Sequence, residues 1–473
     1  MTGNLKPYSE YKDSGVPWIG SIPTHWDIRR MKLLLREVDL RSATGNEQLL
    51  RVLQYTGVTQ RRSSNGSEEP DTRAASLIGY KRVAADDLII NIMLAWNGSM
   101  GVSRYDGIAS PAYWVYRFKD GAQPWYFHEL LRLPMYKGRI KAASTGVVGS
   151  RLRLYSDDLG RIESIVPPPS EQGAIVRFID HTNRKIERFI RTKKKLIALL
   201  NEQKQAIIHR AVTRGLDPDV RLKPSGVPWL GDIPEHWELR RAKQVCSAIV
   251  DCKNRTPDMV PDGKYVVVRT TNVRHGHFRL DGSYPTDRRN YEIWTQRGAP
   301  RQEDVFFTRE APAGEACLVP NLQNLCMGQR MMYFRPNPEV VESKFLLHSI
   351  YGPVVRTYIE HACNGSTVGH LRLGQVSALP LLWCPLDEQM AIVAHIERES
   401  SPLDDVIARA KREIALLGEY RTRLIADVVT GKVDVREVAM NLPEETDEPE
   451  QFDDTAALAD DEDMTDAAEE AEV

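Results

Sequence analysis

The chain has 473 residues, of which 42% are hydrophobic and 27% are charged, so it can fill two or three domain cores and is too polar for a membrane protein. Fifteen acidic residues and no Lys or Arg lie in residues 441–473. Subtracting these fifteen from the 65 acidic residues leaves 50 against 63 basic ones, so residues 1–440 carry a net charge of +13. A body that basic suits a polyanionic partner.

Membrane insertion, secretion and metal binding find little support in the sequence. The longest strongly apolar run, from Leu88 to Ala95, is too short to span a bilayer, and no signal sequence opens the chain, so we expect a cytoplasmic protein. The six cysteines all lie in the second half, and none forms a CxxC pair. We therefore expect free, mostly buried thiols rather than a zinc site or a disulfide framework.

The chain opens with a segment that it later repeats. SGVPWIGSIPTHWDIRRMK at 14–32 returns as SGVPWLGDIPEHWELRRAK at 225–243, with thirteen of nineteen residues identical. Such a duplication indicates two structural repeats. Proline and glycine favour an extended, turning path, and the tryptophans predict anchors that dock residues 1–27 and the linker 216–238 on a helix or domain edge. For His25 and His236 we favour docking over catalysis.

Two β-rich segments follow these copies, at 28–165 and 239–383. Their clearest predicted strands are short apolar runs separated by Gly, Asn, Asp and Pro: DLIINIML (87–94), YWVYRF (113–118), YVVVRTTNV (265–273), DVFFT (304–308) and MMYFRP (331–336). The interiors share little sequence, but STGVVGSRLRL (144–154) resembles GSTVGHLRL (365–373) near their ends. The sequence thus predicts two domains of similar size. Their flanking segments match and form a repeated frame, whereas their interiors differ.

Each β-rich segment ends in a helical one, at 166–215 and 384–432. Ile186, Lys193, Leu200 and Ile207 fall seven apart, and Phe189 and Leu196 occupy intervening d-type positions beside Ile190 and Ile197. The second copy steps by sevens from Leu403 through Ala410 and Leu417 to Leu424. This spacing predicts a coiled-coil pair, although an ordinary core helix pair is the alternative.

Turn and cap residues predict where these helices begin and end. Thr182-Asn183 and Ser401-Pro402 suit helix starts, so we expect a short helix followed by a long one of roughly 28 residues, about 43 Å, in each copy. Gly215 and Gly431 are placed to end the long helices in the left-handed conformation. Residues 433–473 form an acidic tail, which we expect to be disordered. Of these, residues 441–473 are expected to be dispensable for folding and recognition.

A duplicated frame around variable interiors resembles the specificity subunit of type I restriction–modification enzymes, and the resemblance covers nearly the whole chain. The DSGVPWxG and IPxHW segments, the VPPPSEQxAI and CPLDEQxAI helix starts, the GST-type turn before LRL, and the VTRG and VTGK helix ends carry it. The acidic tail lies outside the pattern. The implied fold is α+β, with two target-recognition domains in pseudo-twofold repeat separated by two long antiparallel coiled-coil helices.

The resemblance also implies a function and partners. Each domain is expected to read one half of a split double-stranded DNA site. The expected partners are two adenine-methylating modification subunits and the ATP-driven restriction subunits. S-adenosylmethionine, ATP and Mg are expected on those partners, and no cofactor is expected in this chain.

Recognisable catalytic motifs do not occur in the sequence. RPNPEV at 335–340 lacks the adjacent prolines and the aromatic residue of a methyltransferase motor, and neither a GxxxxGK[ST] phosphate loop nor HExxH occurs. We therefore expect a non-catalytic DNA-binding subunit. Two alternatives stay open: a stand-alone sequence-specific DNA-binding regulator, which would bind tightly alone, and an unrecognised metal-dependent nuclease, which would cleave DNA alone.

Base readout needs Arg, Lys, Asn, Gln, Ser or Thr presented to a groove, with other cations on phosphates. Several loops in both β-rich segments offer such residues. The predicted DNA-binding residues are Gln54, Tyr55, Thr59, Gln60, Arg61, Arg62, Asn97, Ser99, Thr145, Arg151 and Arg153 in the first segment, and Arg269, Thr270, Asn272, Arg274, His275, Arg309, Arg330, Thr367, His370 and Arg372 in the second.

Overall fold

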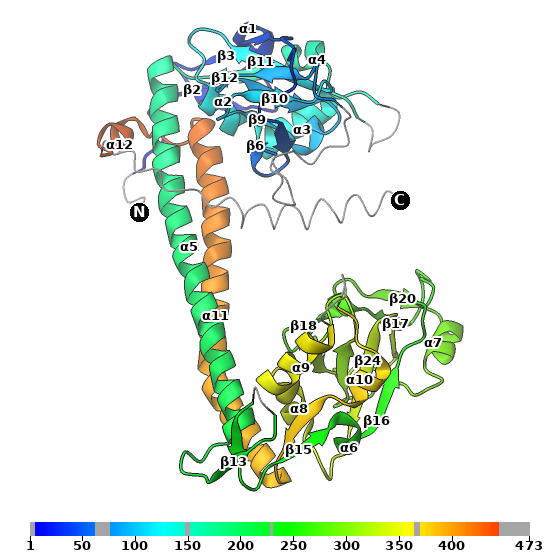
Figure 1. The fold of residues 1–473 in the computed structure, drawn as a ribbon. Helices are drawn as coiled ribbons and strands as arrows, with labels where there is room; N and C mark the ends of the chain where they lie inside the picture. The colour runs from blue at the N-terminus through cyan, green and yellow to red at the C-terminus, as the bar shows by residue number, and fades with distance from the viewer. Residues whose placement is uncertain (1–4, 62–75, 147–151, 228–229, 364–368, 444–473) are drawn as a thin grey trace. The chain divides into compact units, whose positions relative to one another are not determined.

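The computed structural model describes residues 5–61, 76–146, 152–227, 230–363 and 369–443 (Figure 1). It divides into two compact units, one made of residues 1–191 with 413–473 and the other of residues 192–412. Each unit therefore contains one β-rich segment and a part of both long helices. No helix within the described ranges is long and apolar enough to cross a membrane.

Unit 1 is built on a four-stranded antiparallel sheet in the order β4–β11–β8–β9. These strands are Leu35–Glu37, Tyr113–Phe118, Leu88–Asn91 and Met100–Val102. Leu88 and Ile90 face a core that includes α2 (Pro124–Leu131) and α3 (Pro134–Ala143), whereas Ile89 faces a second core. Side chains alternate across a strand, so β8 is buried on both faces, which explains its continuous apolar sequence.

The second core of unit 1 lies under two strand pairs. These pairs are β5 (Leu50–Leu53) with β6 (Gly57–Gln60), and β7 (Lys81–Val83) with β10 (Gly107–Ala109). The remaining elements of the domain are α1 (Met31–Leu34), η1 (Ala95–Asn97) and α4 (Ser156–Arg161). Unit 1 thus has three layers: helices, the sheet and the strand pairs.

Unit 2 repeats this sheet with the same order, β16–β24–β21–β22, and again all pairs are antiparallel. These strands are Cys246–Asp251, Met331–Pro336, Val305–Thr308 and Ala316–Leu318. Val305 and Phe307 face a core with α8 (Ser343–Ile350) and α9 (Pro353–Cys363), whereas Phe306 faces a separate core. The two β-rich segments therefore share their central sheet and helix pair as well as their frames.

The segments differ in the layer that covers the other face of the sheet. Unit 2 carries a three-stranded sheet in the order β20–β17–β23, a small hairpin of β18 and β19, and two helical turns. Their bounds are β20 Tyr284–Thr286, β17 Tyr265–Val268, β23 Leu325–Met327, β18 Val273–Arg274, β19 His277–Phe278, η3 Thr270–Asn272 and α7 Arg288–Trp294. The long strand predicted over 265–273 is therefore wrong after Val268, because the chain turns into η3 there.

The frame of each unit is a set of short paired strands around its domain. In unit 1, β1 (Tyr11–Asp13) pairs with β2 (Ser21–Pro23), and β3 (Asp27–Arg30) pairs with β12 (Glu163–Val166). The matching pairs in unit 2 are β13 (Leu222–Pro224) with β14 (Asp232–Pro234), and β15 (Glu238–Arg241) with β25 (Pro380–Trp383). Unit 2 also contains α6 (Ala242–Val245) and α10 (Leu373–Ser377).

The two long helices are α5 (Pro169–Arg214) and α11 (Leu386–Val429), of 46 and 44 residues. In unit 1, Glu187 pairs with Arg421, and in unit 2, Lys204 pairs with Asp404. Since α5 begins near the end of α11 in unit 1 and ends near the start of α11 in unit 2, the helices run antiparallel in both. Gly215 and Gly431 follow the helices with φ of 71° and 77°, which confirms the predicted left-handed ends.

Two details of the helix prediction are wrong. Neither helix is broken at the expected site: α5 runs through Thr182-Asn183, and α11 contains Pro402 in its interior. The helical seam also uses Ile190 and Ile197, which are partly buried, rather than Phe189 and Leu196, which are 44% and 36% exposed. The seam then alternates in steps of four and three from Ile186, as a coiled coil requires.

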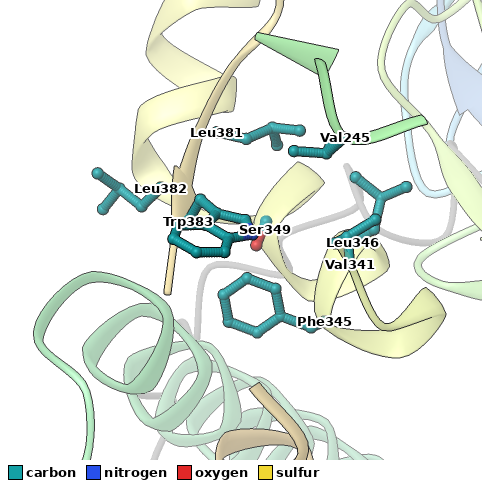
Figure 2. Close-up of a pocket in the computed structure, with 8 residues that line it drawn as sticks. All are labelled: Val245, Val341, Phe345, Leu346, Ser349, Leu381, Leu382 and Trp383. Carbon is teal, nitrogen blue, oxygen red and sulfur yellow. The ribbon is translucent and has the colours of Figure 1, made fainter. Parts of the chain in front are cut away.

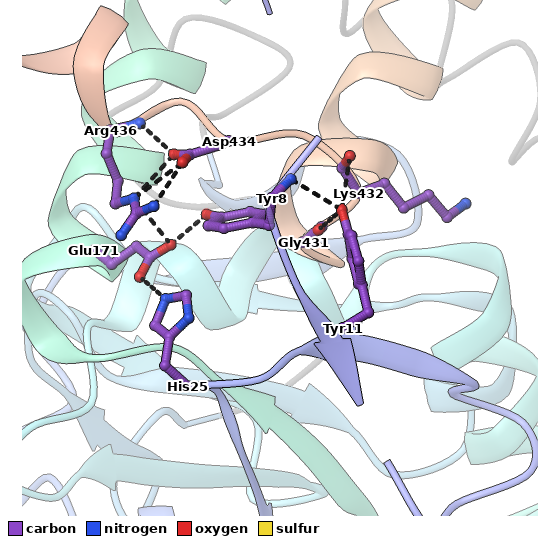
Figure 3. A network of polar contacts seen from close by, with 8 residues as sticks. All are labelled: Tyr8, Tyr11, His25, Glu171, Gly431, Lys432, Asp434 and Arg436. Atoms are coloured by element: carbon purple, nitrogen blue, oxygen red, sulfur yellow. Dashed lines mark hydrogen bonds and ion pairs between the residues drawn. The ribbon is translucent and has the colours of Figure 1, made fainter. Parts of the chain in front are cut away.

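The N-terminal segment of unit 1 lies against the start of α5 and the end of α11 (Figure 3). The buried Glu171 carboxylate accepts hydrogen bonds from Tyr8 and, at 2.8 Å, contacts the His25 ring. Tyr11 donates to the Gly431 carbonyl at 3.1 Å, and the indole of Trp26 packs against Gly431. In unit 2, Glu388 likewise binds His236 and Trp237, and this confirms that both histidines dock the repeated segments.

The first part of the expected disordered tail is folded. Lys6 bridges to Asp434, and a short helix, α12 (Arg436–Met440), buries Ala439. Arg436 pairs with Asp434 at 2.6 Å and lies 3.9 Å from Glu171. Residues 444–473 lie outside the described part of the chain.

Candidate nucleic-acid interface

Three segments meet at one end of the sheet in unit 1. Arg132, at the end of α2, donates to the carbonyls of Met100 at 2.7 Å and of Gln54 at 3.1 Å, and also to that of Tyr55. The turn between β5 and β6 and the turn after η1 are therefore held together. Leu154 donates to the Ile92 carbonyl at 3.0 Å, which adds the segment around Arg153 to the same end.

The predicted residues of unit 1 gather around these contacts. Gln54 and Tyr55 lie in the β5–β6 turn, and Thr59, Gln60 and Arg61 continue along β6. Thr145 and Arg153 bridge one another and are both exposed. Asn97 and Ser99 stabilise the turn in which they lie, since the Asn97 amide oxygen accepts hydrogen bonds from the Ser99 backbone N–H and hydroxyl. Arg62 and Arg151 lie outside the described residues.

In unit 2, a parallel pair of strands brings several of the predicted residues close together. Strands β17 and β23 run parallel, and Gly328 donates to the Val268 carbonyl at 2.8 Å. Because the carboxyl ends of parallel strands meet at one edge, Arg269 and Arg330 leave the sheet at the same edge. Arg309 donates its backbone N–H to the Arg330 carbonyl at 2.9 Å and accepts from Leu371 at 3.0 Å, which brings in His370 and Arg372.

Acidic side chains hold part of this cluster. Glu310 lies 3.3 Å from Arg330 and 3.1 Å from His370, while Arg330 remains 45% exposed. Arg309 forms a largely buried pair with Asp251 at 3.1 Å, so it fixes the sheet rather than offering its charge to solvent. Arg372 is exposed at the start of α10. Arg269, Arg330, His370 and Arg372 are therefore the accessible members of this set.

The remaining predicted residues of unit 2 lie in the η3–β18 segment. Asn272 is fully buried and uses its amide to bind the backbone of Arg269, Arg279 and Asp281, so it supports the loop internally. Thr270 lies in η3, and Arg274 pairs with His277 in the β18–β19 hairpin. His275 sits at the hairpin turn with φ of 49°, where its N–H donates to Glu315 at 2.5 Å. Thr367 lies outside the described residues.

Four cationic side chains that lie near these residues were not among the predicted ones. Lys137 and Lys141 are four residues apart on α3, where Lys137 packs against Gly98 and Lys141 lies 5.5 Å from the Trp96 ring. Burial and Arg132 lower the pKa of Lys137. In unit 2, Lys253 and Arg255 lie over Trp294, and the neighbouring Thr256 accepts from Gln329 beside Arg330. The spacing of lysines on one helical face was a usable signal for the first pair.

Equivalent positions in the two units carry different side chains. The contact between Leu154 and Ile92 in unit 1 recurs in unit 2 as the contact between Leu371 and Arg309, 217 residues further along the chain in both cases. The backbone frame at this edge is thus repeated, while the side chain changes from isoleucine to arginine. Such an edge can present one set of polar groups in unit 1 and another in unit 2.

A cavity in the core of unit 2 offers no alternative ligand site. Figure 2 shows Val245, Phe345, Leu381 and Trp383 around it, with the Ser349 hydroxyl turned inward. Its volume of about 10 Å³ is close to the least that holds one water molecule. Such a water would satisfy the Ser349 hydroxyl, which is otherwise unpartnered, but a cofactor would not fit.

No protein-family model matches the chain. Over 437 residues it is 21% identical to the type I restriction enzyme MjaX specificity subunit of Methanocaldococcus jannaschii, a match that covers 88% of this chain and 96% of that one. Over most of its length the chain is therefore similar to a specificity subunit of a type I restriction enzyme. This confirms the resemblance found in the sequence.

One solved structure shares the fold of this chain. A chain from a type I restriction–modification system has a TM-score of 0.59 at 15% identity, over 86% of this chain and 98% of that one. The HsdS subunit from Thermoanaerobacter tengcongensis gives a TM-score of 0.41 at 16% identity, over 87% and 98%. The first of these confirms the predicted α+β architecture with its long helix pair.

Proposed function

We propose that this specificity subunit binds double-stranded DNA at a split site and directs methylation and restriction by partner subunits. The domain at 28–165 reads one half-site, and the domain at 239–383 reads the other. The chain is a non-catalytic subunit and works in the cytoplasm. S-adenosylmethionine, ATP and Mg belong to the partners.

The observation that carries this proposal is the repeated sheet with a changed edge. Both units have the same four-stranded order and the same helix pair, but the layer that brings polar side chains to the edge differs completely. A repeated scaffold with different contact residues suits the reading of two different short sequences. The net charge of +13 over residues 1–440 suits a DNA backbone.

The contact residues we propose are the accessible ones. In unit 1 they are Gln54, Tyr55, Thr59, Gln60, Arg61, Thr145 and Arg153, joined by Lys137 and Lys141. In unit 2 they are Arg269, Thr270, Arg274, His275, Arg330, His370 and Arg372, joined by Lys253 and Arg255. Asn97, Ser99, Asn272 and Arg309 support these segments through their internal hydrogen bonds.

The long helices offer a surface for two modification subunits. Seven large apolar residues on them are exposed, and all but Met390 immediately precede a seam residue. In an antiparallel pair, such positions point to one flank of both helices. This apolar flank consists of Phe189, Leu416 and Tyr420 in unit 1 and Leu196, Leu199 and Val406 in unit 2. Two similar apolar sets, one per unit, suit two copies of one partner.

The partner surface can be tested with two substitutions on the same helix. Val406→Asp places a charge on the apolar flank, whereas Ala408→Asp places it on the opposite flank, and both positions are exposed. We expect Val406→Asp alone to reduce co-purification of the modification subunit encoded beside this chain. Equal loss with both variants, or with neither, would exclude this flank as the docking surface.

The function itself can be tested with a library of randomised DNA sites. The chain, co-expressed with its neighbouring modification subunit, should methylate a motif of two short specific sequences separated by a gap of fixed length and free sequence. A single continuous motif would contradict the proposal. Tight, specific binding by the chain alone, with no methyltransferase partner, would favour the stand-alone regulator instead.

A further inference from the structure

Two buried glutamines make the same three hydrogen bonds in the two units. Gln172 and Gln389 are the second residues of the repeated Glu-Gln pairs and lie in the first turns of α5 and α11. Both are 0% exposed. A fully buried primary amide needs partners for its oxygen and both of its N–H groups, so its environment fixes its position.

In unit 1 all three partners are backbone groups. The Gln172 amide nitrogen donates to the carbonyls of Pro167 at 2.7 Å and Gly121 at 3.1 Å. Its oxygen accepts from the Gln123 N–H at 2.8 Å. Gln123 immediately precedes α2, so one side chain joins the start of the long helix to the loop that begins the helix layer of the domain.

Unit 2 repeats the pattern with different neighbours. The Gln389 amide nitrogen donates to the carbonyls of Cys384 at 2.7 Å and Val340 at 3.0 Å, and its oxygen accepts from the Glu342 N–H at 2.9 Å. Glu342 immediately precedes α8. Because only backbone groups take part, the joint is independent of the side chains that differ between the two domains.

Proline stiffens the covalent connection beside each glutamine. Pro167, Pro168 and Pro169 lead into α5, and Pro385 leads into α11. Their fixed φ angles limit how the chain can pivot between the last strand of the domain and the helix. Rotation of the domain about this connection must therefore break the glutamine hydrogen bonds, which makes the glutamine the second point of attachment.

We propose that Gln172 and Gln389 are positioning residues that set the angle between each recognition domain and its long helix, and thereby the gap lengths that the complex accepts. This inference rests on the proposed reading of a split site. The half-site sequence is read by the edge loops, whereas the gap depends on where those loops are held. Loosening the joint should widen the range of accepted gaps and leave both half-sites unchanged.

Gln172→Glu tests this with little change in shape. The carboxylate can still accept from Gln123, but it faces the Pro167 and Gly121 carbonyls with no donor. Gln205→Glu is the matched control, since Gln205 is exposed on the same helix. Methylation by the complex with its modification subunit would be measured on DNA with the wild-type half-sites and gaps one base pair shorter, equal or longer.

We expect the preference for the wild-type gap over its neighbours to fall roughly three- to tenfold in Gln172→Glu, the equivalent of about one net hydrogen bond. Gln389→Glu should act likewise, and Gln205→Glu should keep the wild-type preference. If Gln172→Glu does not fold, Gln172→Met removes the same bonds without placing a charge against the carbonyls.

The outcomes separate this inference from the function on which it rests. A folded Gln172 variant with unchanged gap preference would overturn the positioning role and leave the split-site function intact. A change in the half-site sequence would also overturn it, because the glutamine would then act on readout. If the wild-type complex itself shows no preferred gap, the proposed function fails first.

Discussion

Single exposed side chains at the sheet edges are the residues through which we propose that each unit contacts DNA. Arg330 is the most informative of them, because it directly precedes β24 in a left-handed conformation with φ of 74° and stays 45% exposed. Glu310, which also pairs with His370, holds Arg330 in place without burying it. Arginine in this setting suits a groove or phosphate contact.

Arg330→Ala should weaken specific binding by about 1–3 kcal/mol, the usual cost of losing one arginine contact to a base. Arg288→Ala is the control, since Arg288 is exposed in the same unit and pairs with Glu292 on α7. Binding of the assembled complex to its cognate duplex, titrated at several salt concentrations, measures the effect. Equal losses in the two variants would remove Arg330 from the interface.

His128 should make the chain less stable in acid. Its Nδ1 accepts a hydrogen bond from the Val102 N–H at 3.0 Å, so the ring is neutral in the fold. Burial, with Arg132 and Arg104, lowers the pKa of His128 from 6.5 to about 3. Between pH 6.5 and about 3 the unfolded state binds one more proton than the folded state. This histidine's contribution to stability therefore decreases as the pH is lowered, by ~1.4 kcal/mol per pH unit.

His128→Gln keeps an acceptor but cannot be protonated. The melting temperature of this variant should fall less than that of the wild type as the pH is lowered from 6.5 to 4. His348 is left in place in both proteins, because burial also lowers its pKa, to about 4, and its contribution cancels in the comparison. Parallel pH profiles for the two proteins would contradict the assignment.

The helical elements show where sequence reasoning succeeds and where it stops. Heptad spacing and the terminal glycines predict the helix pair and its ends, because both depend on local periodicity and local backbone conformation. The break expected at Pro402 does not occur. Ile407 and Ala410, the next seam residues, are buried, and burial along the seam outweighs the ~3 kcal/mol that an interior proline costs.

Pro402→Ala should therefore stabilise α11. Removing the proline restores a backbone donor and relieves the clash with the preceding turn, so we expect a gain of about 1–3 kcal/mol. Ser401→Ala, at the exposed neighbouring position, controls for the higher helix propensity of alanine. Thermal melts compare the two. A Pro402→Ala variant that melts no higher than Ser401→Ala would mean that the proline serves the helix as it stands.

The sequence predicts the duplication, but it does not predict that the N-terminal segment contacts the end of α11. Tyr11 contacts Gly431 across 420 residues, and no local pattern announces such a contact. The sequence also did not reveal that both units have the same central sheet. A buried strand requires only apolar residues, so equivalent strands in the two units can differ in sequence. The DNA-binding residues stay a prediction, but the internal roles of Asn272 and Arg309 could not be read from the sequence, because Arg309 pairs with Asp251, 58 residues away, and Asn272 with the Asp281 carbonyl in a loop of irregular backbone.

The length of the helix pair should set the length of the gap between the two half-sites, as a ruler would. Half-sites read from one side of a duplex lie about one turn apart, ~34 Å. Inserting four residues between Leu196 and Leu200 and between Glu413 and Leu417 adds about 6 Å and turns the far domain by ~40°. The accepted gap should lengthen by a base pair or two with both half-sites kept. Methylation of a gap-length library measures this, and an unchanged preferred gap would refute the ruler.

The central claim is that each unit reads its own half of the site. Replacing residues 28–165 with the corresponding segment of a relative of different specificity changes one recognition domain and keeps both long helices and the second domain. The motif methylated by the chimera, mapped across a genome, should differ from the parental motif in one half only, with the same gap. A chimera that methylates a motif changed in both halves would contradict the claim.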